Sequence, residues 1–371
     1  MKKVFSSIWA FCKREVVLSI ASVAAIITMF FVPPDGEYLD YFEWKTLIAL
    51  FCMLAVVAGL KHTNVFELIS RKMIGLFHTR RAVIYALVYG TFFFDMIVAN
   101  DMSLITFLPL TYIVLHSTGN DKYLSFTFIM QTIAANMGGM VTPYGNPQNL
   151  YLYSFFEIPT LEFFSVLLIQ NIAVLVMLFI VCRFIKNEEL VLKNDEPLVI
   201  DTKQLIVYVA LFVMVILSIF RVIPHSITLA VVILAVFIVD KSRFKHVDYA
   251  LLATFCVFFV FSGNMARIEA LKDVIEGIVT ENVLAAGIVS CQFISNVPTA
   301  IFLSKFTTNW QDLLVAVNVG SLGIIISSLA SLITLKEYLK HQPEGFKKYM
   351  IKFTLINTLF LVVLLAVTIL T

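Results

Sequence analysis

Two acidic side chains lie inside apolar sequence: Asp95, which follows "TFFF", and Asp101, in the short polar stretch "ANDMS" at 99–103. A charge at the centre of a bilayer costs about 2.5–3.5 kcal/mol even on lenient insertion scales, so a functional role is the first hypothesis for such a residue. A carboxylate at Asp101 could ligate Na⁺ or take up a proton. The alternative is that Asp101 caps the helix expected over 102–116. For Asp95, the favoured interpretation is a satisfied polar contact inside a helix bundle.

A second polar stretch, "SNVPT" at 295–299, carries hydroxyl and amide groups but no charge. Such groups, with a helix N-terminus behind them, suit the oxygens of a carboxylate substrate. The candidate substrate-binding side chains in the two stretches are Asn100, Ser103, Ser295, Asn296 and Thr299. The alternative for the second stretch is a turn around Pro298 that Ser295 caps.

The segment "TPYGNPQN" at 142–149 places three helix breakers inside an apolar run. Non-helical backbone at membrane depth is tolerated only where it is buried in protein or lines a wet cavity. We therefore interpret the segment as a break in a transmembrane helix, where freed carbonyls and polar side chains could bind a cation. The candidate groups are Thr142, Gly145, Asn146 and Asn149, and Asn146 is also a candidate for contact with the substrate. A proline kink without a ligand role is the alternative.

A third segment, "IIISSLAS" at 324–331, is the candidate counterpart of 142–149 in the second half of the chain. Its hydroxyl groups could complete an ion site, and the candidates are Ser327, Ser328 and Ser331. The alternative is that these are buried serines hydrogen-bonded to the preceding helical turn.

The composition fixes the class of protein that must position these groups. Hydrophobic residues make up 60% of the 371 residues, charged ones 14%, and the mean hydropathy is +0.92. Many uncharged runs approach the ~20 residues that cross a bilayer. These values predict an all-α, polytopic protein of the lipid bilayer. With a net charge of +2 and no basic cluster among aromatics, no nucleic-acid partner is expected. No cofactor, catalytic residue or metal other than Na⁺ is predicted, since GxxxxGK[ST], HExxH and GxSxG are all absent.

The second half of the sequence resembles the first in three places that occur in the same order. The pairs are 47–59 with 251–263, 99–103 with 295–299, and 136–150 with 318–332. An odd number of crossings separates the copies, so they should have opposite orientations. Inverted-topology repeats with interrupted helices in corresponding places are typical of secondary transporters.

These matches define the expected organisation. The predicted parts are an N-terminal repeat (1–186), a cytoplasmic linker (187–203) and a C-terminal repeat (204–371). Each repeat should contain a re-entrant hairpin, at 82–116 and 282–304, and a discontinuous transmembrane helix, at 123–156 and 311–335. Most of the 27 Lys and Arg fall on one side of this arrangement. The positive-inside rule then predicts a multi-pass protein of the cell (inner) membrane, with its N-terminus in the cytoplasm and its C-terminus outside.

The stretches "ANDMSLITFLPL", "TPYGNPQNLYLYS" and "SNVPTAIFLS" resemble the ion transporter superfamily, and citrate-transporter-like and divalent anion–sodium permeases most closely. Arsenite efflux permeases and a class of sodium/proton antiporters are related. The resemblance implies a homodimer whose substrate binds between the two hairpin tips and the two broken-helix loops, with sodium sites in the same elements. Dicarboxylate symporters carry Ser-Asn-Thr at each tip, where this sequence has Ala99-Asn100-Asp101 and Ser295-Asn296-Val297. The Asn-Asp pair is closer to the arsenite and sodium/proton members.

The expected function is secondary active transport of a small organic anion, citrate or another di- or tricarboxylate, coupled to Na⁺ or H⁺ by alternating access. The alternative is a sodium/proton antiporter or arsenite-type efflux permease in which Asp101 is the ion-exchanging carboxylate. A passive channel would need only one discontinuity, and no Ser, His and Asp are grouped as an intramembrane enzyme would need.

Overall fold

The computed structural model describes residues 15–98, 100–190 and 200–371. In these ranges the regular structure is helical, and the prediction of an all-α membrane protein is confirmed. Six helical spans among the described residues are long and apolar enough to cross a bilayer. They are α3 (Trp44–His62), α5 (Arg80–Val98), α9 (Thr160–Arg183), α10 (Thr202–Ile219), α12 (Tyr249–Arg267) and Pro343–Leu370, which contains α18 (Phe346–Leu370). A bent pair, α13 (Glu269–Glu281) with α14 (Val283–Ile294), makes a seventh if it counts as one span.

Helices of the two halves begin at positions that follow the sequence alignment. α4 (Val65–Gly75) begins at residue 65 and α13 at residue 269. α6 (Asn100–Ser117) and α15 (Asn296–Leu303) both begin at the aligned asparagine. α8 (Pro147–Phe155) and α17 (Leu329–His341) also begin at aligned residues, 147 and 329. The positions that align between the two halves of the sequence are therefore also positions at which helices begin.

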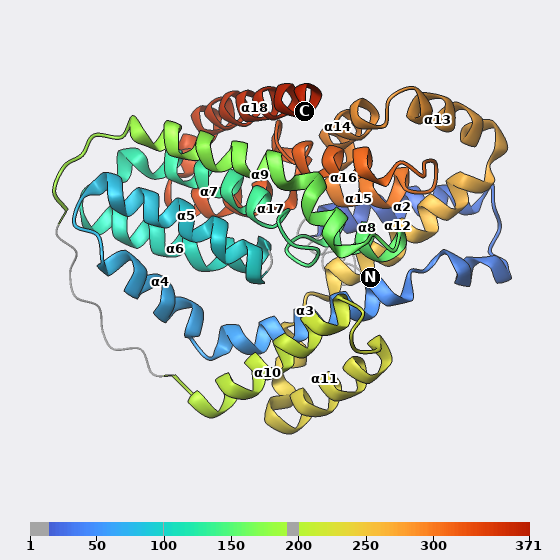
Figure 1. The fold of residues 1–371 in the computed structure, drawn as a ribbon, viewed down its shortest axis with the longest axis horizontal. Coiled ribbons are helices and arrows are strands. Elements are labelled where there is room, and N and C mark those ends of the chain that lie inside the picture. Colours follow the sequence, from blue (N-terminus) through green and yellow to red (C-terminus); the bar gives the residue numbers. More distant parts are fainter. Residues whose placement is uncertain (1–14, 99, 191–199) are drawn as a thin grey trace, which may run out of the picture.

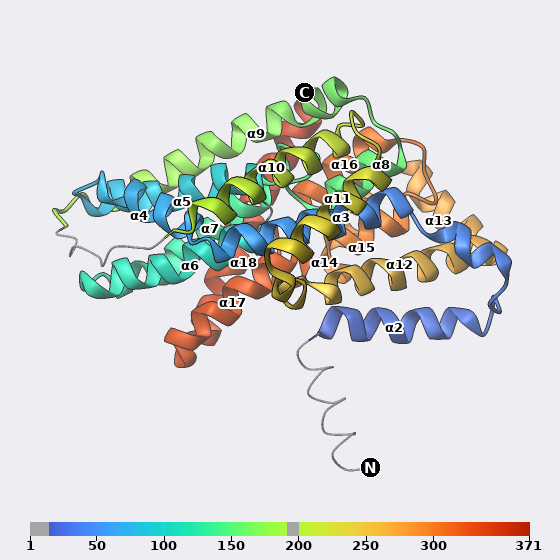
Figure 2. The same cartoon turned by 90° about the horizontal axis from the view of Figure 1, so that it is seen from below.

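Helices of each half pack against helices of the other half (Figures 1 and 2). α2 (Val16–Met29) packs on α12, whereas α11 (His225–Asp240) packs on α3. In the same way α8 packs on α15, whereas α17 packs on α6, and α9 lies along α18. Each of these contacts from the first half to the second thus has a counterpart from the second to the first. This reciprocity is what a two-fold relation between the halves would produce.

Each half contains a helical hairpin with a tight tip. α5 ends at Val98 and α6 begins at Asn100; α14 ends at Ile294 and α15 begins at Asn296. Ser295, between α14 and α15, has φ +73° and ψ 160°, a region that only glycine adopts readily. Such a conformation costs about 1–3 kcal/mol and clusters at functional sites. That the hairpins enter and leave the membrane on one side remains a prediction.

Each half also contains a helix that stops and restarts. α7 (Leu124–Gly138) is followed by eight non-α residues before α8, and α16 (Trp310–Val319) is separated from α17 by 320–328. Pro147 occupies the first turn of α8, where its fixed φ and missing N–H are tolerated. Gly138 is required by close packing, because a Cβ there would lie 2.2 Å from the Phe92 carbonyl oxygen. The segments 139–146 and 320–328 are called the first and second break below.

The predicted linker at 187–203 is only partly visible, since 191–199 lie outside the described residues. Its start is fixed to the beginning of α5. Arg80 forms an ion pair with Glu188, and the Leu190 N–H donates to the His78 carbonyl at 2.9 Å. The Arg80 guanidinium lowers the pKa of the Glu188 carboxyl.

Candidate functional site

The tip of the first hairpin supplies Asn100, Asp101 and Ser103 from the first turn of α6. The Asn100 amide donates to the Asn136 side-chain oxygen at 3.1 Å. Ser103 is fully buried and donates to the Thr91 carbonyl at 3.1 Å, so it joins the two arms of the hairpin. Asp101 lies inside the first turn of α6, one residue after the helix begins, and not at the capping position.

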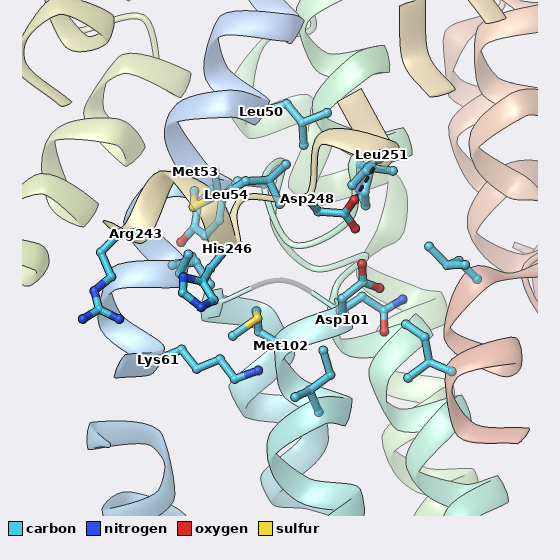
Figure 3. Close-up of a pocket in the computed structure, with 18 of the residues that line it drawn as sticks. Leu50, Met53, Leu54, Lys61, Asp101, Met102, Arg243, His246, Asp248 and Leu251 are labelled. Carbon is cyan, nitrogen blue, oxygen red and sulfur yellow. Dashed lines mark hydrogen bonds between the residues drawn. The ribbon is translucent and has the colours of Figure 1, made fainter. Parts of the chain in front are cut away.

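A cavity of about 680 Å³ lies between α3, the tip of the first hairpin and the starts of α8, α12 and α17. Asn100 and Asp101 line it. In Figure 3, the Asp101 carboxylate points toward Asp248, which caps α12 by accepting from the Leu251 N–H at 2.9 Å. Basic residues line the same cavity: Lys61, His62, Arg243, His246 and Lys336. The cavity therefore combines facing carboxylates with a basic group of side chains.

The first break folds tightly on itself. Asn149 donates to the Gly139 carbonyl at 3.1 Å and to the Thr142 carbonyl at 3.4 Å. The Thr142 hydroxyl donates to the Met96 carbonyl at 2.9 Å, which ties the break to the end of α5. A Cβ on Gly145 would lie 2.5 Å from the Gly139 carbonyl oxygen. These contacts make the break a defined structure and not a simple kink.

Asp95 and Asn146 converge on this break. A Cβ added to Gly139 would lie 2.5 Å from Asp95 Oδ2 and 2.3 Å from Asn146 Oδ1, so both oxygens border the same small space. Asp95 is 0% exposed and Asn146 1%. Among the described residues, neither Asp95 oxygen nor Asn146 Oδ1 accepts a hydrogen bond. The Asn146 amide donates to the Asn136 carbonyl at 3.0 Å, which fixes Oδ1 as the atom that faces Asp95.

The expectation of a satisfied polar contact for Asp95 is wrong. The donors beside its carboxylate are the Gly139 N–H and the Ser103 hydroxyl. Both are used elsewhere: the Gly139 N–H donates to the Ala135 carbonyl and the Ser103 hydroxyl to the Thr91 carbonyl. A buried carboxylate without donors is costly unless it is protonated or paired with a cation. Asp95 is therefore a candidate ion-binding residue, which the sequence interpretation did not include.

The tip of the second hairpin is buried and lies against the second break. The Ser295 hydroxyl donates to Asn296 Oδ1 at 3.3 Å and to the Ser327 carbonyl at 3.4 Å. Thr299 donates to the Ser295 carbonyl at 2.8 Å. The Ser295 side chain caps no backbone N–H of α15, so the alternative of a Ser295-capped turn is wrong. Of the described residues that line the cavity, none belongs to 295–299.

The serines of the second break divide between the two interpretations. Ser327 donates to the Ser321 and Ile324 carbonyls, each at 2.7 Å, as expected of a serine bonded to its own preceding turn. Ser328 caps α17 and donates to Asn136 Oδ1 at 2.7 Å, so it reaches the first half of the chain. Ser331 is fully buried, and its hydroxyl has no partner among the described residues.

Two aligned asparagines connect the breaks. Asn136 Oδ1 accepts from Asn100 in the first hairpin and from Ser328 in the second break. Asn318, its counterpart in α16, donates to Asn149 Oδ1 at 2.7 Å and accepts from Gln148 at 3.3 Å. The sequence alignment paired these asparagines, but their bridging role was not predicted. Their shared position just before each break is the signal that could have found it.

The sequence profile of the citrate transporter family matches residues 7–330, a range that includes both hairpin tips and the whole first break. The chain belongs to the citrate transporter family. The resemblance to citrate-transporter-like permeases is therefore confirmed. Together with the six apolar spans, this membership identifies a multi-pass membrane transporter.

Relatives of this citrate transporter family member agree with that class. An uncharacterized transporter of Methanocaldococcus jannaschii is 31% identical over 327 residues, which are 86% of this chain and 88% of that protein. The inner membrane protein YbiR of Escherichia coli K12 is 25% identical over 312 residues, 83% of each chain. A Dictyostelium discoideum protein that carries the name arsB is 24% identical over 156 residues, which are 40% of this chain and 26% of its own length.

Proposed function

We propose that this protein is a secondary active transporter that moves a small organic anion, citrate or another di- or tricarboxylate, together with Na⁺ or H⁺ by alternating access. One observation carries the coupling: the Asp95 carboxylate and Asn146 Oδ1 face one space beside Gly139 without donors. Two such oxygens repel each other unless a cation or a proton lies between them. Carboxylate and amide oxygens are also the ligands that hard cations prefer.

The cation position communicates with the cavity through Asn136. The Asn136 carbonyl accepts from Asn146, which borders the cation position, and the Asn136 side chain accepts from Asn100, which lines the cavity. Occupation of the space beside Gly139 would therefore fix the orientation of Asn100 toward the substrate. This link gives ion and substrate binding a shared physical element, as coupled transport requires.

The cavity fits an anionic substrate that arrives with a cation. Its basic side chains would raise the local concentration of anions. The facing carboxylates Asp101 and Asp248 would oppose an anion unless a cation or protons compensate them. Lys61, Arg243 and Lys336 line the cavity and lie on the side of the predicted arrangement that holds most of the Lys and Arg, which the positive-inside rule assigns to the cytoplasm, so we propose that this conformation is open inward.

The remaining elements of the predicted site are proposed with it. Asn100 is the substrate ligand best supported, because it lines the cavity. Substrate contacts by Ser103, Ser295, Asn296 and Thr299 would require rearrangement of the hairpins. Reciprocal packing between the halves supports the proposed inverted repeats. The homodimer, the re-entrant hairpins and the cytoplasmic N-terminus are proposed on the resemblance and the charge distribution alone.

Uptake into proteoliposomes tests this function. Labelled citrate and succinate should enter faster when an inward Na⁺ gradient or an inward proton gradient is imposed, with saturable kinetics. An uptake rate that is unchanged by both the Na⁺ gradient and the proton gradient would contradict coupled transport.

A second candidate is cation/proton exchange or arsenite-type efflux, with Asp101 as the exchanging carboxylate. The facing carboxylates of Asp101 and Asp248 favour it, because two like charges on one cavity favour the uptake of a proton or a cation by one of them. Proton release from proteoliposomes on addition of Na⁺, without uptake of any carboxylate, would support this candidate over the first.

A further inference from the structure

The two breaks are equivalent in position but different in chemistry. Gly138 at the end of α7 packs against Phe92 in α5, and its counterpart Gly320 packs against Ile288 in α14, where an added Cβ would lie 3.0 Å from the Ile288 Cα. The same alignment places Cys291 opposite Asp95, and a Cβ on Gly320 would lie 3.0 Å from the Cys291 sulfur. The second half therefore has a thiol where the first half has its buried carboxylate.

A glutamine side chain occupies the second break. Gln292 Nε2 lies 2.9 Å from the Gly320 carbonyl oxygen and 3.0 Å from that of Leu322, and it donates to both. Its oxygen accepts from the Ile324 N–H at 3.1 Å. The opposite orientation of the amide would point an oxygen at two carbonyl oxygens, so the contacts fix the assignment. Gly323, at φ +112°, leaves room for this amide, because a Cβ there would lie 2.3 Å from the Gln292 oxygen.

Four backbone carbonyls of the second break thereby accept hydrogen bonds from side chains of the same half. Gln292 serves those of Gly320 and Leu322, and the Ser327 hydroxyl serves those of Ser321 and Ile324. These are the atoms that a cation would need as ligands. In the first break the Gly139 and Thr142 carbonyls also accept from a side chain, Asn149. The difference is that Asp95 and Asn146 Oδ1 border one space there without a donor.

We propose that this transporter binds one coupling cation per chain, at the first break, and that the Gln292 amide blocks the second break by donating to the carbonyls of Gly320 and Leu322. The inference rests on the proposed coupled transport and adds its stoichiometry. Gln292 acts as a specificity residue: its NH₂ group donates to the carbonyls of Gly320 and Leu322, which a second ion would otherwise use as ligands. The second half would then move with the substrate and contribute no ion.

Ion counting on the purified full-length protein tests the proposal. ²²Na⁺ bound at equilibrium is measured at constant ionic strength, and bound protons are measured as the difference in potentiometric titration between wild type and Asp95→Asn. The two counts should sum to one per wild-type chain, and ²²Na⁺ binding should vanish in Asp95→Asn. Two ions per wild-type chain, or one Na⁺ retained in Asp95→Asn, would overturn the proposal while leaving coupled transport standing. A sum of zero would instead overturn the coupled function together with it.

A gain of function provides the second arm. Gln292→Glu replaces the donor with an oxygen that faces the Gly320 and Leu322 carbonyls, so ²²Na⁺ binding should rise by one per chain. Gln131→Glu is the matched control, because Gln131 donates to the Thr91 hydroxyl at 3.1 Å, away from both breaks. An equal rise in both variants would show that any buried glutamate recruits Na⁺ and would contradict the role of Gln292. If Gln292→Glu does not fold, the numbers of ions bound by wild type and by Asp95→Asn still test whether one cation binds per chain.

Discussion

Asp95 in α5 and Asn146 at the end of the first break point their oxygens at the same space beside Gly139. Neither oxygen has a donor among the described residues, although both side chains are buried. The two residues belong to different elements, α5 and the N-cap of α8, so any ion between them bridges the first hairpin and the first broken helix. A movement of either element would change the ion's coordination, which is the property that coupling needs.

Gly139→Ala should remove the ion dependence of transport. The added methyl group would occupy the space that Asp95 and Asn146 border, so we expect at least a tenfold loss of apparent cation affinity, or about 1.4 kcal/mol. Gly277→Ala in α13 is the matched control, since a Cβ there meets nothing within 4 Å. Cation-dependent uptake that is equal in the two variants would place the ion elsewhere.

The variants Asp95→Asn and Asp101→Asn should distinguish the roles of the two carboxylates in transport. Asp95 borders the first break, so its loss should abolish the dependence of uptake on Na⁺ and pH while substrate binding persists. Asp101 lines the cavity, so its loss should change the apparent affinity for the anion more than the ion dependence. The measurement is uptake over a matrix of Na⁺ concentrations and pH values. The reverse pattern would favour the exchange mechanism that uses Asp101.

Asn136→Ala should uncouple the binding of the ion from the transport of the substrate. The variant removes the acceptor shared by Asn100 and Ser328, and each lost hydrogen bond should cost about 0.6–2 kcal/mol of stability in the membrane. We expect uptake that persists down the substrate gradient but no longer responds to an ion gradient. Asn357→Ala in α18 is the control, because Asn357 is also buried but donates only to its own helix. Loss of coupling in both variants would indicate general destabilisation.

Ser295→Gly and Ser295→Ala should distinguish strain from side-chain chemistry at the second tip. Glycine relieves the unfavourable φ of +73°, about 1–3 kcal/mol, whereas alanine keeps the strain. If the hydroxyl is needed only for its contact with the Ser327 carbonyl, the glycine variant should melt at a higher temperature than the alanine variant and both should transport. If the hydroxyl binds substrate, both variants should lose transport to the same extent. Thermal melting and initial uptake rates are measured on the same preparations.

Much of the fold could be predicted because its signals are local. Apolar runs mark the spans, and Pro147 with its neighbouring glycine marks the first break. The weak alignment of the halves also placed the starts of α15 and α17 opposite those of α6 and α8. These features depend on residue type and spacing, which a single sequence displays directly.

The site was harder to predict because it depends on which side chains have partners. Asp95 and Asp101 look alike in the sequence, but only packing shows that Asp95 faces Asn146 and Asp101 faces the cavity. Gln292 gave no signal at all, since a glutamine in an apolar helix has no distinctive spacing. Its role appears only when the carbonyls of the second break are seen around it.

In the proposed mechanism, an ion held at Asp95 drives anion transport. The most direct measurement is the accumulation of labelled citrate in proteoliposomes that contain wild-type protein or Asp95→Asn, with an inward Na⁺ gradient and an inward proton gradient imposed separately. We predict that wild type accumulates citrate above its external concentration under one of these gradients and that Asp95→Asn reaches only equilibrium. Accumulation by Asp95→Asn equal to that of wild type would show that an ion at Asp95 does not drive transport.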